Sequence, residues 1–176
     1  MTPPQNIQSF DFNLLINLCL IILFTTCAIT DLTHRKIYNI QTYSTIICGL
    51  SLNYLAGGWT GMFRSFCGLL IGSSLLFVFF LLGGVGGGDI KFLGAIGALK
   101  GSNFTIWTMF YTGLIGGAMA FAIIIWKGTF RKTIINLLRY LRHPFSPKTD
   151  AEKQGHQYLP YGLAISFGCL WALFTL

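Results

Sequence analysis

Two aspartates in this sequence border long apolar stretches, which is an unusual place for a charged group. The chain has five acidic residues, and Asp11, Asp150 and Glu152 lie in polar surroundings, whereas Asp31 and Asp89 adjoin hydrophobic runs. A carboxylate near hydrocarbon costs a few kcal/mol and usually serves a function. Two neighbouring carboxylates share one proton and so supply an acid and a base together. We therefore hypothesise that Asp31 and Asp89 form a pair that could activate water, with neither role assigned to one residue.

The residues around Asp89 strengthen this hypothesis. Residues 83–88 read Gly-Gly-Val-Gly-Gly-Gly, a poor helix former that lets another chain approach the backbone closely. Irregular backbone at membrane depth is tolerated only beside protein or a wet cavity, so we expect Asp89 to face a wet cleft. Gly86 and Gly88 would bind a substrate strand through their backbone. Lys91 either assists there electrostatically or extends to the membrane interface, and the latter is slightly favoured.

Structural explanations compete with each of these assignments. Aspartate is favoured at helix N-termini, so Asp89 could simply cap the short apolar run that starts at Ile90. Asp31 could be an interfacial residue at the end of a helix. The glycine segment could be a flexible connection between two helices.

Two other functional classes also fit. A small proton- or ion-coupled transporter would use Asp31 and Asp89 to bind ions or relay protons, and broken glycine-rich helices are common in transporters. A non-catalytic assembly subunit would use spaced glycines for helix packing. The glycine pairs of that kind are Gly97 with Gly101 and Gly113 with Gly117.

No other catalytic chemistry has a clear signature in the sequence. The three histidines lie in polar segments and show no pairing with a nucleophile. The cysteines are scattered through apolar segments without a Cys-x-x-Cys pair, so neither zinc binding nor redox chemistry is indicated. They are Cys19, Cys27, Cys48, Cys67 and Cys169. We expect no metal, no cofactor and no covalent intermediate.

The composition defines the setting in which the aspartates must be positioned. Of 176 residues, 53% are hydrophobic and 10% charged, against about 25% charged in soluble domains. The aromatic content of 15% excludes disorder. We predict an all-α polytopic membrane protein with about six transmembrane helices. The net charge of +7 comes mainly from residues 127–153 and 35–36, which is typical of cytoplasmic loops and membrane lipid rather than nucleic acid.

Six apolar runs, separated by polar or glycine-rich segments, divide the chain. A lead-in at residues 1–11, expected to be disordered, precedes one membrane-embedded domain over residues 12–176. Within that domain, the basic segment 127–158 has the pattern of a helix lying on the membrane surface, and residues 83–101 could be re-entrant. The runs span residues 12–29, 40–56, 64–82, 90–101, 104–126 and 159–176, with a tight glycine connection at 57–61.

Lysine and arginine positions predict the orientation. The lead-in has neither residue, so the N-terminus is expected outside, with Arg35, Lys36 and the segment 127–158 inside. Arg64 is a weak exception to the rule, because this orientation places it on the outer side of the membrane. The orientation places Asp31 and Asp89 at the same depth, on the cytoplasmic side of the membrane.

Three segments together resemble a known family. Residues 86–92, Gly-Gly-Gly-Asp-Ile-Lys-Phe, fit the Gly-x-Gly-Asp motif of intramembrane aspartic proteases in the form seen in type IV prepilin peptidases. Residues 31–39 resemble the first aspartate motif of that family, with Tyr38 where proline is usual. Residues 159–162, Leu-Pro-Tyr-Gly, are similar to the start of its last helix.

The resemblance implies an activity and a location. Family members cleave the N-terminal leader of prepilin-like precursors, including Flp pilins and pseudopilins, commonly after a glycine. The cleavage would take place at the cytoplasmic face of the inner membrane, with Asp31 and Asp89 as the catalytic residues. Because no zinc-binding cysteine pairs precede the first run, we expect the short, peptidase-only form without a methyltransferase region. The identity of the pilin and the oligomeric state stay open.

Overall fold

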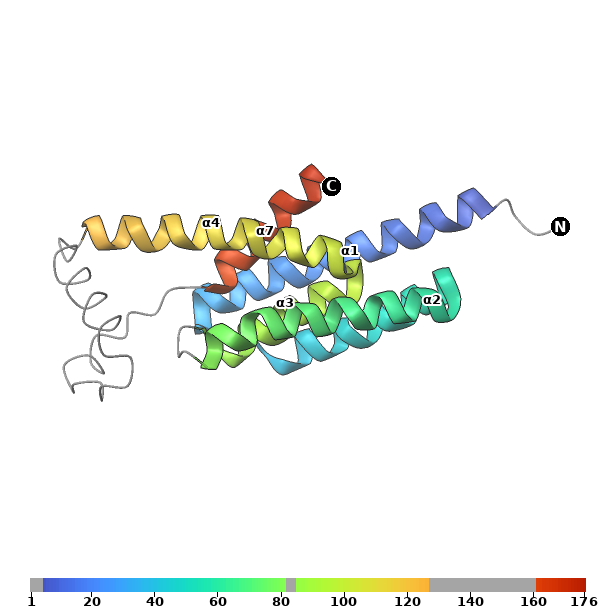
Figure 1. The fold of residues 1–176 in the computed structure, drawn as a ribbon, viewed down its shortest axis with the longest axis horizontal. Helices are drawn as coiled ribbons and strands as arrows, with labels where there is room; N and C mark the ends of the chain where they lie inside the picture. The colour runs from blue at the N-terminus through green and yellow to red at the C-terminus, as the bar shows by residue number, and fades with distance from the viewer. Residues whose placement is uncertain (1–4, 82–84, 127–160) are drawn as a thin grey trace. The chain divides into compact units, whose positions relative to one another are not determined.

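The structure, a computed structural model, describes residues 5–81, 85–126 and 161–176, and these ranges consist of helices with short connections and contain no strand (Figure 1). The all-α prediction is therefore confirmed for the described residues. Three helical segments are long and apolar enough to cross a membrane, namely Phe12–His34, Asn39–Leu81 and Ser102–Ile123. Six crossings and the outward N-terminus stay predictions. The helices are α1 (Gln5–His34), α2 (Asn39–Leu81), α3 (Gly87–Lys100), α4 (Ser102–Trp126) and α7 (Tyr161–Thr175).

The chain divides into two compact units. The first comprises residues 1–115 and 160–176, and the second comprises residues 116–159. All the residues discussed below as a site belong to the first unit. The basic segment 127–158 lies outside the described residues, as does its expected surface helix. A single membrane-embedded domain over residues 12–176 stays a prediction.

Helix α1 extends further in both directions than its apolar run. It begins at Gln5, so the expectation of a disordered lead-in is wrong for residues 5–11. It also continues through Asp31 to His34, whereas the sequence suggested a polar turn from residue 30. The helix ends where Arg35 adopts a left-handed backbone with φ 52°, a conformation unfavourable for a residue with a Cβ. The connection to α2 comprises residues 35–38.

Helix α2 reverses direction at a glycine and contains two predicted apolar runs. Gly58 has φ 58° and ψ −144° inside the element, and Figure 1 shows the chain turning back there so that the two halves run side by side. A Cβ on Gly61 would overlap the carbonyl group of Asn53, so the turn needs glycine there as well. The predicted connection at residues 57–61 agrees with this reversal.

Helix α3 is the centre of the first unit. It packs against α1, both halves of α2, and α7. An apolar helix without a polar face is suited to such complete burial. At 14 residues it is about 21 Å long, shorter than the ~30 Å hydrocarbon core of a bilayer, and it is not among the candidate spans. Its buried residues are Asp89, Phe92, Leu93, Gly94, Ala95, Ile96, Gly97, Ala98 and Leu99.

Close backbone packing and side-chain hydrogen bonds hold the C-terminal end of α3. A Cβ on Gly97 would overlap the carbonyl group of Gly68 in α2. The last carbonyls of a helix lack partners within it. Here the Ser65 hydroxyl donates to the Ala98 carbonyl, and Asn53 Nδ2 donates to the carbonyls of Ala98 and Leu99 at 3.2 and 3.0 Å. Both halves of α2 thus stabilise this end.

Helix α7 packs against α1 and α4 through small residues. The Ser166 hydroxyl lies 3.1 Å from the Phe24 carbonyl oxygen of α1. A Cβ on Gly168 would lie 2.7 Å from the backbone nitrogen of Thr112 in α4. Further along, the rings of Tyr111 in α4 and Trp171 in α7 lie 6.4 Å apart. The contacts fix the position of α7 along α1.

Candidate active site

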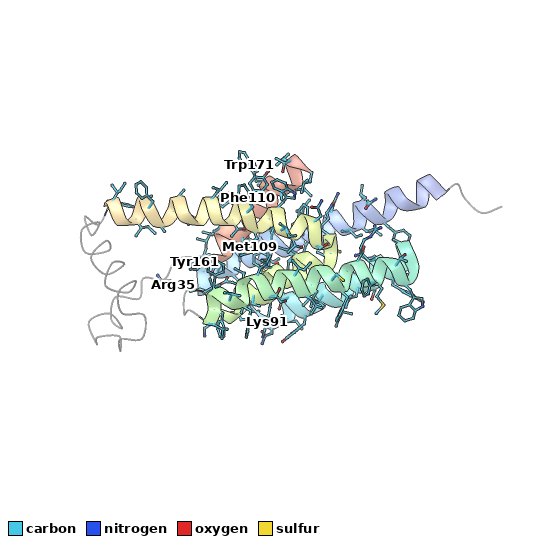
Figure 2. All side chains as sticks on the ribbon, in the orientation of Figure 1. Arg35, Lys91, Met109, Phe110, Tyr161 and Trp171 are labelled. Atoms are coloured by element: carbon cyan, nitrogen blue, oxygen red, sulfur yellow. The ribbon has the colours of Figure 1, made fainter. Side chains whose placement is uncertain are left out.

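Asp31 lies in the last turns of α1, where α7 covers it. Its side chain is 2% exposed, although it belongs to a helix that presents many apolar side chains at the surface. The backbone N–H of Leu163 donates to Asp31 Oδ2 at 3.3 Å. A Cβ on Gly162 would lie 2.7 Å from the same oxygen, so the carboxylate packs directly on the α7 backbone. Figure 2 shows Arg35 and Tyr161, the neighbours of this contact, at the same end of the unit.

Asp89 occupies the first turn of α3. Its Oδ2 accepts a hydrogen bond from the Gly86 N–H at 3.1 Å, while its own N–H donates to the Gly86 carbonyl at 3.1 Å. The side chain is 9% exposed. Asp89 thus caps the start of α3, as the structural alternative predicted. A capping role does not exclude a chemical one, because a carboxylate has two oxygens and about four lone-pair sites for hydrogen bonds.

Burial changes the acidity of Asp89, which lies outside the candidate membrane-spanning helices. Loss of solvent raises the pKa of this carboxyl from 3.8 to about 6. The hydrogen bond from Gly86 opposes the rise, and the negative charge of Asp31 adds to it. An acid titrating near neutrality is useful as a proton donor and acceptor, and a catalytic role for Asp89 stays a prediction.

The fold brings the two acids to one end of the first unit. The C-terminal end of α1 and the N-terminal end of α3 lie at the same end of the bundle (Figure 1). The charge of Asp31 acts on Asp89, and Cys27, one turn before Asp31, lies within electrostatic range of both carboxylates. The shared location agrees with the expectation of equal depth, whereas the side of the membrane stays a prediction.

The two glycines expected to bind substrate have different surroundings. Gly86 is exposed, and a Cβ there would meet only Asp89 Oδ2, at 3.2 Å. Gly88 faces the connection between α1 and α2, since a Cβ there would lie 3.1 Å from Ile37 Cβ. Gly87 and Gly88 are already helical, so the irregular segment is shorter than the sequence suggested. Substrate binding by Gly86 and Gly88 stays a prediction.

Lys91 contacts the start of α2. Its Nζ donates to Asn39 Oδ1 at 2.9 Å and lies 5.1 Å from the centre of the Tyr43 ring. A cation over an aromatic ring gains about 0.5–1 kcal/mol at an exposed site. The contacts join α3 to α2 beside the acids, and a role for Lys91 in substrate binding stays a prediction.

The sequence did not identify the contact between α7 and Asp31. The motif at residues 159–162 indicated the start of a helix, because proline is common just before or at the first helical position. Nothing in the local sequence indicates that Gly162 and Leu163 meet Asp31, more than 130 positions earlier. Among the described residues, no group of three or more His, Cys, Asp or Glu could hold a metal ion.

Two buried acids characterise this end of the first unit, and their joint role in catalysis stays a prediction. Both are buried on separate helices, one accepts a backbone N–H from a third helix, and the other has its pKa raised to about 6. In comparisons with known proteins, the family model described as the type IV leader peptidase family matches residues 18–121. This range includes both acids and excludes α7. No curated protein and no solved structure matches the chain.

Proposed function

Because the chain belongs to the type IV leader peptidase family, we propose that it is an aspartic endopeptidase in which Asp31 and Asp89 together activate water. The observation that supports this proposal is that two buried carboxylates, from α1 and α3, belong to one end of the first unit, where the charge of Asp31 contributes to the raised pKa of Asp89 (Figure 1). Like charges so placed favour a state in which the pair holds one proton.

The singly protonated pair can complete a hydrolysis without a metal or a covalent intermediate. The ionised carboxylate takes a proton from water as the water oxygen bonds to the carbonyl carbon. The protonated carboxyl gives its proton to the carbonyl oxygen. When the resulting diol collapses, the C–N bond breaks, the nitrogen takes the proton that came from water, and the other carboxylate regains its proton from a hydroxyl. The pair returns to its starting protonation.

The proposed substrate is a prepilin-like or pseudopilin precursor. Its apolar helix would lie in the membrane, and its short leader would reach Asp31 and Asp89 from the cytoplasm. The basic residues Arg35 and Lys36, together with the basic segment 127–158, favour this orientation under the positive-inside rule. The site would then act at the cytoplasmic face of the inner membrane, where the leader joins the helix.

The decisive experiment compares cleavage by three variants of the full chain. Wild type, Asp31→Asn and Asp89→Asn are mixed in detergent with a synthetic precursor that has a polar leader, a glycine and an apolar helix. Either substitution keeps the shape of the side chain but removes the titrating group, so we expect at least a thousandfold loss of kcat in a folded protein. Asp11→Asn is the control, since it lies 20 residues before Asp31 on α1, about 30 Å away.

The outcomes separate the functional classes. Cleavage by Asp31→Asn or Asp89→Asn at the wild-type rate would remove that residue from catalysis. A wild type that never cleaves the precursor, but moves protons or ions across vesicles with a rate sensitive to both positions, would instead identify a transporter. Full activity in Asp11→Asn is required for the losses to be assigned to the pair.

A further inference from the structure

Backbone atoms in the first turn of α7 contact Asp31. Leu163 N–H donates to Asp31 Oδ2 at 3.3 Å. At Gly162, an added Cβ would lie 2.7, 2.9 and 3.1 Å from Oδ2, Cγ and Cβ of Asp31. Real Cβ atoms do not approach other heavy atoms at 2.7 Å, so any side chain at this position would displace the carboxylate or the helix.

This contact supplies what an ionised carboxylate needs. The N–H groups in the first turn of a helix have no partner within it, and the helix dipole favours negative charge there. A hydrogen bond to a charged acceptor is stronger than one between neutral groups. Because the bond reaches one oxygen of Asp31, it also restricts rotation of the carboxylate about its Cβ–Cγ bond.

We propose that the first turn of α7 is a positioning element of the active site, in which Gly162 admits the Asp31 carboxylate and the Leu163 N–H holds it in its reactive orientation. This inference rests on the proposed function and extends the site beyond residues 18–121, the part matched by the family. Neither Gly162 nor Leu163 exchanges a proton with substrate. They act through Asp31.

A second contact keeps α7 in register for this role. One turn beyond Gly162, the Ser166 hydroxyl lies within hydrogen-bond distance of the Phe24 carbonyl of α1, at 3.1 Å, and of the Gly162 carbonyl, at 2.8 Å. Phe24 precedes Asp31 by two turns of α1. Sliding of α7 along α1 would break this contact and the Leu163 bond together. Since a misplacement of about 1 Å at a reacting group can cost a hundredfold in rate, the register matters to catalysis.

The first test isolates the N–H donor. Leu163→Pro removes the backbone N–H, and proline is tolerated in the first turn of a helix, where that group lacks an intrahelical partner. Leu163→Ala keeps the N–H and loses the same apolar side chain. We expect kcat for Leu163→Pro to be at least thirtyfold below that of Leu163→Ala, with KM values within threefold of each other. Equal kcat values in the two variants would overturn the inference.

The second test isolates the space at Gly162. Gly162→Ala crowds Asp31, whereas Gly168→Ala crowds α4 on the same helix, at 2.7 Å from the Thr112 nitrogen. We expect both to lower the thermal unfolding temperature, but only Gly162→Ala to reduce kcat, by about a hundredfold with KM nearly unchanged. Losses of kcat that simply follow the unfolding temperature in both variants would show a structural role and refute the inference.

The wild type and Asp31→Asn accompany both tests on the synthetic precursor. Cleavage by the wild type and loss in Asp31→Asn establish the proposed function independently of α7. With that result in hand, equal behaviour of the Leu163 variants contradicts this inference alone. A wild type without cleavage contradicts the proposed function, and the inference falls with it.

Discussion

The two ends of α3 are built on different principles. At the C-terminal end, neutral groups from α2 meet the last carbonyls, and two glycines bring the backbones of α2 and α3 into contact. At the N-terminal end, Asp89 is buried, accepts a hydrogen bond from the Gly86 N–H, and has the charge of Asp31 acting on it. One end satisfies its polar groups and packs tightly, while the other holds an incompletely compensated charge.

The C-terminal end of α3 contributes to stability, whereas the N-terminal end holds the candidate catalytic acid at a cost in stability. A buried carbonyl with a donor contributes to folding, and close packing determines the position of the helix. A buried acid with a raised pKa opposes folding when it is ionised. Because α3 is short, the tightly packed end keeps the acid in place about 15 Å away. The fold therefore tolerates an unfavourable group at one end by anchoring the other.

The largest expected effect on folding is at the packed end. Gly97→Ala would push a Cβ into the carbonyl group of Gly68 and to within 3.0 Å of the Leu69 nitrogen, and since these are backbone atoms, they cannot rotate away. We expect a loss of about 3 kcal/mol or more in the free energy of unfolding, measured by thermal unfolding in detergent. Gly113→Ala is the control, because nothing lies within 4 Å of its Cβ position. Equal stability of both variants would refute the tight contact.

The next effect is at the N-terminal end of α3, where replacing Asp89 is expected to raise the free energy of unfolding rather than lower it. Burial raises the pKa of Asp89 from 3.8 to about 6, so the folded state binds more protons than the unfolded state between these values. Stability therefore falls as the pH rises through this window, by up to about 3 kcal/mol in total. Asp89→Asn removes this cost without changing the shape of the side chain.

We accordingly expect Asp89→Asn to unfold at a higher temperature than the wild type at pH 8 and at the same temperature near pH 3.5. The measurement is thermal unfolding at a series of pH values, with Asp11→Asn as the reference variant. A difference that does not change with pH would mean that burial of the charge is not the cause. A less stable Asp89→Asn at pH 8 would contradict the comparison between the two ends.

The smallest effect concerns one hydrogen bond at the packed end. Ser65→Ala removes the hydroxyl that donates to the Ala98 carbonyl, which Asn53 still contacts, so we expect a loss of about 1 kcal/mol in unfolding free energy. Ser74→Ala is the matched control on α2, since its exposed hydroxyl donates to the Ile71 carbonyl within its own helix and the substitution should change stability by less than about 0.5 kcal/mol. Equal unfolding free energies of the two variants would mean that side-chain hydrogen bonds do not anchor the C-terminal end of α3.

Much of the fold follows from patterns that are local in the sequence. Long apolar runs predict helices of membrane length, and a glycine cluster at residues 57–61 predicts the reversal that Gly58 makes. The two acids are recognisable because each adjoins an apolar run. Helix ends are less predictable, since α1 continues through Asp31 to His34, where polar residues suggested a turn.

The rest depends on contacts between distant segments, which no local pattern contains. Residues 90–101 are too short to indicate that α3 is enclosed on all sides. The glycines near Asp89 suggested room for a substrate, whereas Gly88 packs against Ile37. Gly162 resembles an ordinary residue at the start of a helix, and only the fold shows that a carboxylate occupies the space beside it.

The separation of Asp31 and Leu163 along the chain has a consequence for biosynthesis. The N–H donor is added 132 residues after the acid that it holds, and at about 5–20 residues per second a ribosome needs roughly ten seconds to make that interval. Once Asp89 has been added, the nascent chain contains both aspartates but not the turn that orients the first, until Leu163 follows 74 residues later. With the role proposed for α7, the site around Asp31 is complete only after α7 has emerged and docked on α1.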